Sequence, residues 1–323
     1  MNSARDHILG RLSGSTAPVS GDTLAAELNL SRTGVWKHIQ VLRKQGADIL
    51  AMSGRGYSLN SEIFSPVTLR PLLKGHIIGK GPSSNIRILE ETESTNRDAM
   101  REAELGAAEG LTIFAERQRS GRGRLGRTWH TMPDSLACSV LLRPKLPPEK
   151  VPQLSLLTAV ALHEALSGLA PDIRIKWPND LLYHGAKVAG ILTEMRAEPG
   201  MAHAVVLGFG INLHAPSDGW PSDIRQAATD LTTIAGRPFS RLELAAQVLN
   251  SLDAWYQKYL QHGFTPVHQA WWRAHAASGQ QVRVHDGKTY IEGIASALDE
   301  DGAMLLDTKH GTRRIIAGDL ELL

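Results

Sequence analysis

Residues 117–127 read RQRSGRGRLGR, so five arginines and three glycines stand within eleven positions, and Trp129 follows closely. Such a run cannot lie in a core, because the guanidinium groups repel one another and buried charges without partners are very costly. It follows the apolar stretch LTIFA at 111–115, which is typical of a buried strand. The sequence therefore predicts a mobile cationic loop at the end of a strand.

A loop of this composition needs an anion to become ordered. The planar fork of arginine suits phosphate and carboxylate, and glycine allows backbone amides to approach such groups closely. The pattern indicates a phosphate or nucleotide site; the alternatives are a solvated basic loop or a nucleic-acid patch of the Arg/Gly type. An Arg/Gly RNA-binding protein would need repeated Arg-Gly units or stacking aromatic residues, whereas this loop is single and only 5% of the residues are aromatic.

A second polar segment stands where another strand ends. Residues 173–180 read IRIKWPND, in which an apolar strand stops at a proline followed by two turn-forming residues. Lys187 then opens a further strand-like stretch, VAGILTE at 188–194. Alone, the segment from Pro178 to Asp180 is interpreted as a turn. Together with the arginine-rich loop it indicates a site.

Four motifs, in this order, resemble those of the biotin protein ligases, whose catalytic domain carries GRGRxGR, KWPND, KxxGIL and GxGIN. They stand at 121–127, 176–180, 187–192 and 208–212, and the resemblance extends over essentially the whole chain. It implies a multidomain α+β protein. The expected parts are a winged helix-turn-helix at 1–62, a catalytic domain at 66–275 with a mixed sheet of the class II synthetase-like, biotin–lipoate ligase type, and a small SH3-like β-barrel at 278–323.

Length and composition agree with such an organisation. The chain has 323 residues, 42% of them apolar and 21% charged, which is enough for two or three domains. A net charge of +2 does not indicate global polyanion binding, so any nucleic-acid function must rest on a local patch. The single cysteine, Cys138, excludes an internal disulfide framework. With no apolar signal sequence and no run approaching about 20 apolar residues, we expect a soluble cytoplasmic protein.

The first 62 residues show the pattern of three short helices and a hairpin. Apolar residues recur at helical spacing, Ser20 and Ser31 stand at N-cap positions, and Gly46 ends the third helix. The segment SGRG at 53–56 predicts a hairpin wing with a basic tip. This is the signature of a helix-turn-helix. The predicted DNA contacts are Arg32, Thr33, Lys37, Gln40, Lys44 and Arg55.

A helical packing module with a solvated face is the alternative for this N-terminal unit. For Trp36 the sequence leaves two roles open, packing against the wing or contact with the sugar-phosphate backbone of DNA. The unit resembles that of the bifunctional subclass of biotin protein ligases, which also represses the biotin operon. The resemblance implies operator DNA as a partner and a homodimer when the adenylate is bound. A ligase with a vestigial DNA-binding domain is the alternative.

The rest of the chain mixes strands and helices. We expect a short connecting helix after Ser65-Pro66, strands at 86–91, 111–116, 136–143, 173–177, 188–196 and 203–213, and helices at 96–105, 152–169 and 241–260. Consecutive strands with helices to one side predict an α+β layered domain. From residue 278 onward, short strands are separated by Asp286-Gly287, Asp301-Gly302 and His310-Gly311, which predict two-residue hairpin turns.

The resemblance also implies the chemistry. A ligase that forms an acyl-adenylate brings a carboxylate to the α-phosphate of ATP, so its site must supply cations and exclude water. A glycine-hinged arginine loop could close over the reactive anhydride. The substrates implied are biotin and ATP with its Mg²⁺, and the acceptor is the biotin carboxyl carrier protein. No resident metal site is expected, because the 13 histidines show no closely spaced set of ligands.

The resemblance assigns three sets of residues. The catalytic ones are Lys187, which would draw the carboxylate and phosphate together, Asp180, which would position the acceptor lysine or accept its proton, and Arg124. The biotin contacts are Ser94, Thr95, Asn96, Gln118, Arg122, Gly123, Arg124 and Lys187. The nucleotide contacts are Arg122, Arg124, Arg127, Trp129, Asn179 and Asn212.

Each of these positions has a plainer interpretation. Residues 94–96 could form a helix N-cap and have no contact with a ligand. Trp129 could be a core residue rather than a stacking face for adenine, and Lys187 could be a solvated lysine at the start of a strand. Gly208 and Gly210 could form a β-bulge instead of allowing close approach to a ligand.

Two other functions compete with the biotin ligase. Lipoate–protein ligases share the domain type and the two-step adenylation, but their loop resembles RRxxGGGxVYH, and nothing like it occurs here. The other is a transcription regulator whose C-terminal domain only senses a small ligand. The presence of Lys187, Asp180 and the full arginine-rich loop favours an active enzyme.

Overall fold

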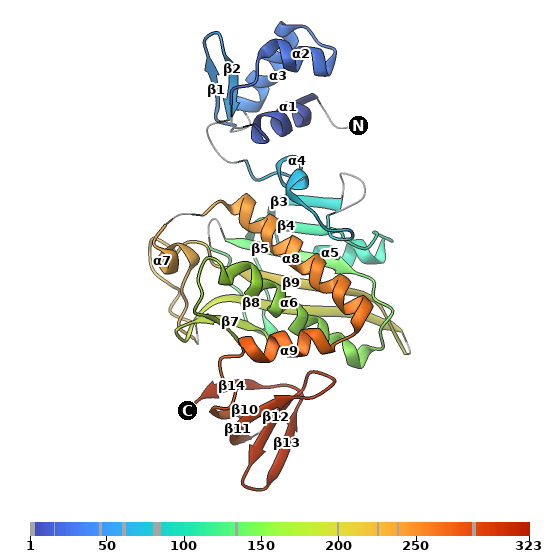
Figure 1. The fold of residues 1–323 in the computed structure, drawn as a ribbon, viewed down its shortest axis with the longest axis vertical. Coiled ribbons are helices and arrows are strands. Elements are labelled where there is room, and N and C mark those ends of the chain that lie inside the picture. The colour runs from blue at the N-terminus through green and yellow to red at the C-terminus, as the bar shows by residue number, and fades with distance from the viewer. Residues whose placement is uncertain are drawn as a thin grey trace.

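The computed structural model describes residues 4–15, 17–44, 47–59, 63–79, 85–132, 135–198, 200–224, 226–237, 239–285 and 289–323. These form a helical N-terminal unit, a large central domain and a small C-terminal β unit, arranged along the long axis of the molecule (Figure 1). The predictions made for Gly46 and for the turn at Asp286-Gly287 lie outside the described residues.

The N-terminal unit is the predicted helix-turn-helix with a hairpin wing. It comprises α1 (Ala4–Ser13), α2 (Gly21–Leu28), α3 (Arg32–Lys44), β1 (Ile49–Met52) and β2 (Gly56–Leu59). Ser20 accepts a hydrogen bond from the Thr23 N–H at 3.0 Å and Ser31 accepts one from the Gly34 N–H at 3.1 Å, which confirms both predicted N-caps. The apolar helix faces meet in a core of their own.

The predicted connecting helix, α4 (Pro66–Leu69), is followed by the 3-10 turn η1 (Arg70–Leu72). On one side, Ile63 and Val67 pack against the N-terminal core. On the other, Phe64 makes an edge contact with Phe114 of the sheet, with ring centroids 5.1 Å apart. The Arg241 guanidinium lies 4.5 Å from the centroid of the Phe64 ring. The connection therefore touches both units.

The segment after η1 is tied to the long helix α8 (Arg241–His262). The carboxylate of Asp253, only 2% exposed, accepts hydrogen bonds from the backbone N–H groups of residues 76–78 at 2.7–2.9 Å. One turn earlier on α8, Asn250 accepts from the Lys74 N–H at 2.6 Å and donates to the Leu72 carbonyl at 2.9 Å. Because buried backbone groups need partners, these two side chains fix the path of the segment.

The central domain is built on a seven-stranded mixed sheet in the order β3-β4-β5-β9-β8-β7-β6, in which only β3 and β4 are parallel. The strands are β3 (Ile86–Thr92), β4 (Thr112–Gln118), β5 (Leu136–Leu142), β6 (Ile173–Lys176), β7 (Asp180–Tyr183), β8 (Ala186–Glu198) and β9 (Met201–Ile211). Strand β7 was not predicted. Lys176 pairs with Asp180 across the hairpin, so Asp180 begins a strand and does not end a turn.

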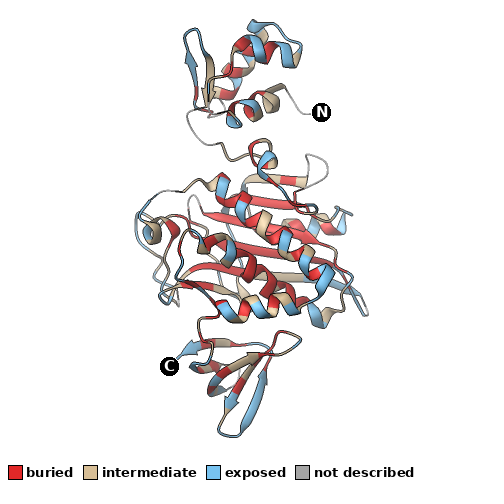
Figure 2. Cartoon of the chain, viewed as in Figure 1, coloured by how far each residue is buried: buried red, intermediate tan, exposed pale blue. Residues whose placement is uncertain are grey.

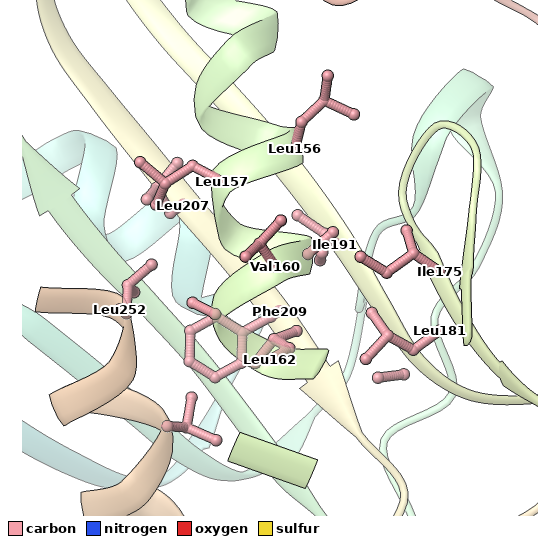
Figure 3. Packing of buried hydrophobic residues seen from close by; sticks show 14 of the residues in the cluster. Leu156, Leu157, Val160, Leu162, Ile175, Leu181, Ile191, Leu207, Phe209 and Leu252 are labelled. Atoms are coloured by element: carbon pink, nitrogen blue, oxygen red, sulfur yellow. The ribbon is translucent and has the colours of Figure 1, made fainter. Parts of the chain in front are cut away.

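Helices cover both faces of this sheet. One face carries α6 (Val151–Ser167), α8 and α9 (Thr265–Ala274), as Figure 1 and the buried positions in Figure 2 show. Figure 3 shows Leu157 and Val160 of α6 packed with Leu207 and Phe209 of β9. The prediction of helices on one side only was wrong, because α5 (Thr95–Glu104) lies on the other face. There Ala99 forms a separate small core with alternate strand residues and lets the helix lie close.

Two helices were missed. The helix α7 (Leu231–Ala235) is too short to show a periodic apolar pattern, and α9 follows α8 after a break at Gly263. Gly263 has φ +67, a backbone conformation that favours glycine.

The C-terminal unit is a small antiparallel sheet in the order β13-β12-β11-β10-β14. Its strands are β10 (Gln281–His285), β11 (Tyr290–Leu298), β12 (Met304–Thr308), β13 (Gly311–Ile315) and β14 (Asp319–Leu322). Thr308 pairs with Gly311, so a two-residue turn is present, but its residues are Lys309 and His310, one position before the predicted His310-Gly311. The prediction for Asp301-Gly302 was wrong. Strands β11 and β12 are joined by a longer loop, in which Asp299 accepts from the Asp301 and Ala303 N–H groups at 2.9 and 2.8 Å.

A buried histidine lies where the central domain meets the C-terminal unit. The ring of His275 stacks on Trp271 with centroids 4.5 Å apart, and its Nδ1 lies 2.9 Å from the Ile175 carbonyl oxygen. Burial lowers the pKa of His275 to about 4, although the hydrogen bond with Ile175 opposes the shift. The folded protein therefore holds this ring neutral.

This pKa predicts a loss of stability in mild acid. An unfolded chain protonates its histidines near pH 6.5, whereas folded His275 resists protonation down to about pH 4. The free energy of unfolding should thus fall as pH drops from 6.5 to 4, by about 3 kcal/mol from this side chain. Urea unfolding followed by tryptophan fluorescence at several pH values measures it. His275→Asn should flatten the slope in that window; an unchanged slope would refute the assignment.

Candidate ligand-binding site

A cavity of about 760 Å³ brings the four motifs together. Its walls come from the start of α5, the arginine-rich loop (117–127), the turn between β6 and β7, strands β8 and β9, and the segment 220–228. The C-terminal unit closes one side with residues of β10, β11 and β14. The predicted catalytic, biotin and nucleotide residues all lie on these walls: Ser94, Thr95, Asn96, Gln118, Arg122, Gly123, Arg124, Arg127, Trp129, Asn179, Asp180, Lys187 and Asn212.

Glycines form the part of the sheet that faces the cavity. Gly190 of β8 pairs with Gly210 of β9, and the register is regular here, so the β-bulge interpretation was wrong. A Cβ on Gly210 would lie 2.3 Å from the Trp129 ring, and one on Gly208 would lie 2.0 Å from Asn96 Oδ1. The glycines therefore make room for Trp129 and Asn96 on the sheet surface. Trp129 is half-buried on the cavity wall.

The start of α5 forms a polar end of the cavity. Ser94 occupies the N-cap position, but its hydroxyl makes no capping hydrogen bond. Gln118 Oε1 accepts from the Thr95 N–H at 3.0 Å and lies 3.2 Å from the Thr95 hydroxyl, while its Nε2 donates to Thr131 at 2.9 Å. These residues thus begin a helix and line the cavity at once.

Sequence reasoning missed two polar residues that support this end. Ser139 is fully buried on β5, and its hydroxyl lies 2.7 Å from Thr95 Oγ1 and 2.6 Å from Asn96 Oδ1. Glu194 of β8 accepts from Arg122 Nη2 at 2.8 Å and from Asn96 Nδ2 at 2.8 Å. The signal was present, since each is a polar residue within a strand interpreted as buried.

A lysine–aspartate pair lines the cavity beside the turn between β6 and β7. Lys187 Nζ is 2.6 Å from Asp180 Oδ1 and 5.5 Å from the centroid of the Trp129 ring. The side chain of Lys187 is 25% exposed, so it is not the solvated lysine of the plainer interpretation. Lys176, which the site prediction omitted, also lines the cavity and donates to Gln226 Oε1 at 3.2 Å. Burial lowers the pKa of Lys176, with Lys187 adding to the effect and Asp180 opposing it.

The arginine-rich loop reaches the C-terminal unit. Arg124 Nη1 donates to Asn179 Oδ1 at 3.2 Å and lies 3.5 Å from the Gly318 carbonyl, and burial lowers the pKa of Arg124. Arg127 forms an ion pair with Asp319. Burial opposes ionisation of Asp319, but this ion pair outweighs it and the pKa of Asp319 lies below its ordinary value. The contacts with the C-terminal unit could not be predicted from the sequence, because they join residues more than 190 positions apart.

Asn212 supports the backbone beside Lys187. Its Nδ2 donates to the Thr229 carbonyl at 3.1 Å and lies 3.4 Å from the Lys187 carbonyl. Its predicted contact with the nucleotide stays a prediction, and so do the individual ligand contacts of the other cavity residues.

The predicted DNA-contact residues are separate from the cavity. Arg32, Thr33 and Lys37 of α3 and Arg55 of the wing are exposed, and Gln40 is half-buried. Arg32 also pairs with Asp22 at 3.1 Å. The side chain of Lys44 lies outside the described part of the structure. Trp36, left open by the sequence, is 50% exposed on α3.

The described residues contain no group of three His, Cys, Asp or Glu side chains placed to hold a metal ion. None of their helices combines the length and the apolar character that crossing a membrane requires.

Three family models match successive parts of the chain. The Biotin/lipoate A/B protein ligase family matches residues 86–212, an HTH domain matches 5–58, and the biotin protein ligase C-terminal domain matches 277–323. The bifunctional ligase/repressor BirA of Bacillus spizizenii is 36% identical over 94% of each chain. The one from Escherichia coli K12 is 32% identical over 94% of this chain and 92% of its own.

A solved structure is similar as well. The biotin protein ligase from Aquifex aeolicus in complex with biotin and ATP has a TM-score of 0.63 and is 29% identical, covering 74% of this chain and 98% of that one.

Proposed function

The chain belongs to the biotin protein ligase family, and from this premise we propose that it is an ATP-dependent biotin–protein ligase. It forms biotinyl-5′-adenylate and pyrophosphate, and then transfers biotin to a lysine of the biotin carboxyl carrier protein of acetyl-CoA carboxylase. The observation that carries the proposal is the convergence of Lys187, Arg124 and Lys176 with Asp180 on one cavity. Joining a carboxylate to a phosphate requires such a set of cations in a polar, partly closed pocket.

The first step joins two anions. A carboxylate oxygen of biotin forms a bond to the α-phosphorus of ATP, and the bond to pyrophosphate breaks. Lys187 and Arg124 supply the positive charge that this step requires, and both are largely shielded from water. Asp180 holds the Lys187 ammonium in place. Mg²⁺ enters with ATP, bound by phosphate oxygens and water.

The second step uses the same centre. The acceptor lysine, once it has lost a proton, attacks the carbonyl carbon, and AMP leaves with the bridging oxygen. Asp180 is the carboxylate best placed to attract the incoming ammonium, because it lies at the reacting end of the cavity beside Lys187. At the other end, Ser94, Thr95 and Gln118 supply hydroxyl and amide groups that suit the ureido ring of biotin.

The test is ATP-dependent transfer of biotin to a purified carrier domain by the full chain. We expect biotinylated carrier and one pyrophosphate per adenylate formed, with no transfer of lipoate in a parallel reaction. Transfer of lipoate in place of biotin would establish the competing lipoate ligase. Binding of biotin without pyrophosphate release would establish a ligand-sensing regulator.

We further propose that the protein represses biotin genes, acting in the cytoplasm, whose reducing conditions suit a chain with one free cysteine. Arg32, Thr33 and Lys37 lie on the exposed side of α3, which is the second helix of the helix-turn-helix. Such a helix reads the major groove, and two copies bind a palindromic operator.

A free strand edge supports the homodimer. Strand β7 pairs with β8 only over residues 186–190, while β9 pairs with β8 as far as residue 198. Among the described residues, no second strand covers β8 at 193–198, and residues 195–198 are exposed. An open edge of this length is a template for pairing with another strand. We propose that adenylate-bound copies pair along this edge.

Deletion of residues 1–62 should abolish operator binding and leave biotin transfer in place. The deletion removes α1, α2, α3 and the wing, whereas Phe64 and the whole cavity remain. For the full chain, the logarithm of affinity should fall with that of salt concentration by about 0.9 per neutralised phosphate. Fluorescence anisotropy with operator and scrambled DNA, in biotin and ATP, measures both. Equal affinity of the full chain for the two DNAs would leave a ligase with a vestigial domain.

A further inference from the structure

A chain of polar contacts crosses the sheet surface behind the polar end of the cavity. It runs from Thr95 through the buried hydroxyl of Ser139 to Asn96, then to Glu194 and Arg122, with each step between 2.6 and 2.8 Å. It joins four separate elements: α5, the arginine-rich loop, β5 and β8. No motif contains Ser139 or Glu194.

Asn96 is an interior member of this chain. Its Nδ2 donates to Glu194 at 2.8 Å and to the Leu192 carbonyl at 3.1 Å, so both of its N–H groups are engaged. Its Oδ1 lies 2.6 Å from the Ser139 hydroxyl. The amide nitrogen and the amide oxygen of Asn96 are therefore both held by the protein, and Asn96 connects Ser139 to Glu194.

Glu194 holds Arg122 by one nitrogen only. Both carboxylate oxygens of Glu194 lie on the same terminal nitrogen of Arg122, Nη2, at 2.8 and 3.0 Å. The contact therefore leaves Nη1 and Nε of the guanidinium free of Glu194. Glu194 therefore orients the guanidinium of Arg122, whose Nη1 and Nε groups can still donate hydrogen bonds to an anion or a carbonyl.

We propose that Glu194 is a positioning residue of the biotin site. It fixes Arg122 of the arginine-rich loop to Asn96 of α5, so that the loop meets the polar end of the cavity in the geometry that biotin binds. The inference rests on the proposed function, because it takes biotin as the ligand of this end. It adds to that function a carboxylate that acts through Arg122 and Asn96 without a role at the reacting phosphate.

The test is the binding of biotin and, in a separate titration, of ATP to Glu194→Gln, with each ligand measured alone by calorimetry. The amide offers one oxygen to two donors, Arg122 Nη2 and Asn96 Nδ2, and removes the charge that orients Arg122. We expect the Kd for biotin to rise about tenfold, as for a lost charge-assisted hydrogen bond. The Kd for ATP should change less than the Kd for biotin, because Glu194 contacts two of the proposed biotin residues, Asn96 and Arg122, but only one of the proposed nucleotide residues, Arg122. A general loss of structure would weaken both ligands.

A double mutant tests the route of action. In an Arg122→Ala background, Glu194→Gln should raise the Kd by a smaller factor than in the wild-type background, because one of the two groups that Glu194 positions is already absent. The matched control is Glu104→Gln, which removes another glutamate paired with an arginine, Arg196, outside the cavity lining. Its biotin affinity should equal that of the wild type.

Three results would overturn the inference: an unchanged biotin Kd in Glu194→Gln, equal losses for biotin and ATP, or a double mutant that shows the full product of the single effects. Because binding is measured without turnover, these results are distinct from failure of the proposed function. That failure would appear as wild-type protein that binds biotin but releases no pyrophosphate.

Discussion

Lys187→Ala should lower the rate of biotinyl-adenylate formation by about a hundredfold or more, which is the cost of removing one preorganised charge from a reacting centre. The structure strengthens this expectation, because Lys187 is held 2.6 Å from Asp180 and lies over the Trp129 ring, a fixed geometry in a partly closed cavity. Pyrophosphate release under saturating biotin and ATP measures the rate.

The affinity for biotin should change much less than the rate, because most of the proposed biotin contacts are at the other end of the cavity. Lys145→Ala is the control, since Lys145 is exposed and outside the cavity lining. A Lys187→Ala protein that releases pyrophosphate at a near-normal rate would remove this lysine from the mechanism.

Arg124→Ala should release the adenylate at least about tenfold faster, and up to a hundredfold faster, than the wild type. Arg124 connects the arginine-rich loop to Asn179 and, by a longer contact, to the Gly318 carbonyl of the C-terminal unit. Without it the loop loses a contact that would keep it over the intermediate. Escaping adenylate should then biotinylate lysines of bystander proteins.

Bystander labelling is measured by incubating each enzyme with biotin, ATP and an unrelated lysine-rich protein, followed by streptavidin blotting. Arg119→Ala is the matched control, because Arg119 belongs to the same loop but pairs with Glu91 away from the cavity. If Arg124→Ala retains the adenylate as well as Arg119→Ala does, Arg124 has no part in closing the site.

Much of the fold was accessible from the sequence because local signals determine it. The two serine N-caps, the apolar strands and the turn before Gly311 all involve residues close together in the chain. Strand β7 was not predicted from the sequence, because it is only four residues long and starts at Asp180, directly after a proline turn. The position of α5 on the opposite face could not be predicted, since it depends on which face of β4 and β5 is free.

The motifs identified the cavity, but its supports depend on contacts between distant residues. Arg127 meets Asp319, and Asn96 meets Glu194, only once the sheet and the C-terminal unit have formed. Asp319 carries no local pattern, whereas Glu194 was passed over although it is a charged residue in the apolar stretch 188–194. Ser139 was passed over because a hydroxyl in an apolar strand is ordinarily explained by burial, whereas here it holds two residues of the site.

The attachment of the N-terminal unit to the central domain affects which spacing between operator half-sites a pair of molecules could bind. A DNA-binding domain on a flexible linker can bind half-sites at many separations, up to the length of the linker. Here Phe64 is packed against Phe114 and Arg241, and Asp253 and Asn250 pin the chain that follows to α8. If two copies pair as proposed, the central domains would set the distance between the two helix-turn-helix units. Inserting about half a helical turn, some 5 base pairs, between the half-sites would rotate one of them to the far side of the duplex. The second DNA-binding unit would then not reach its half-site.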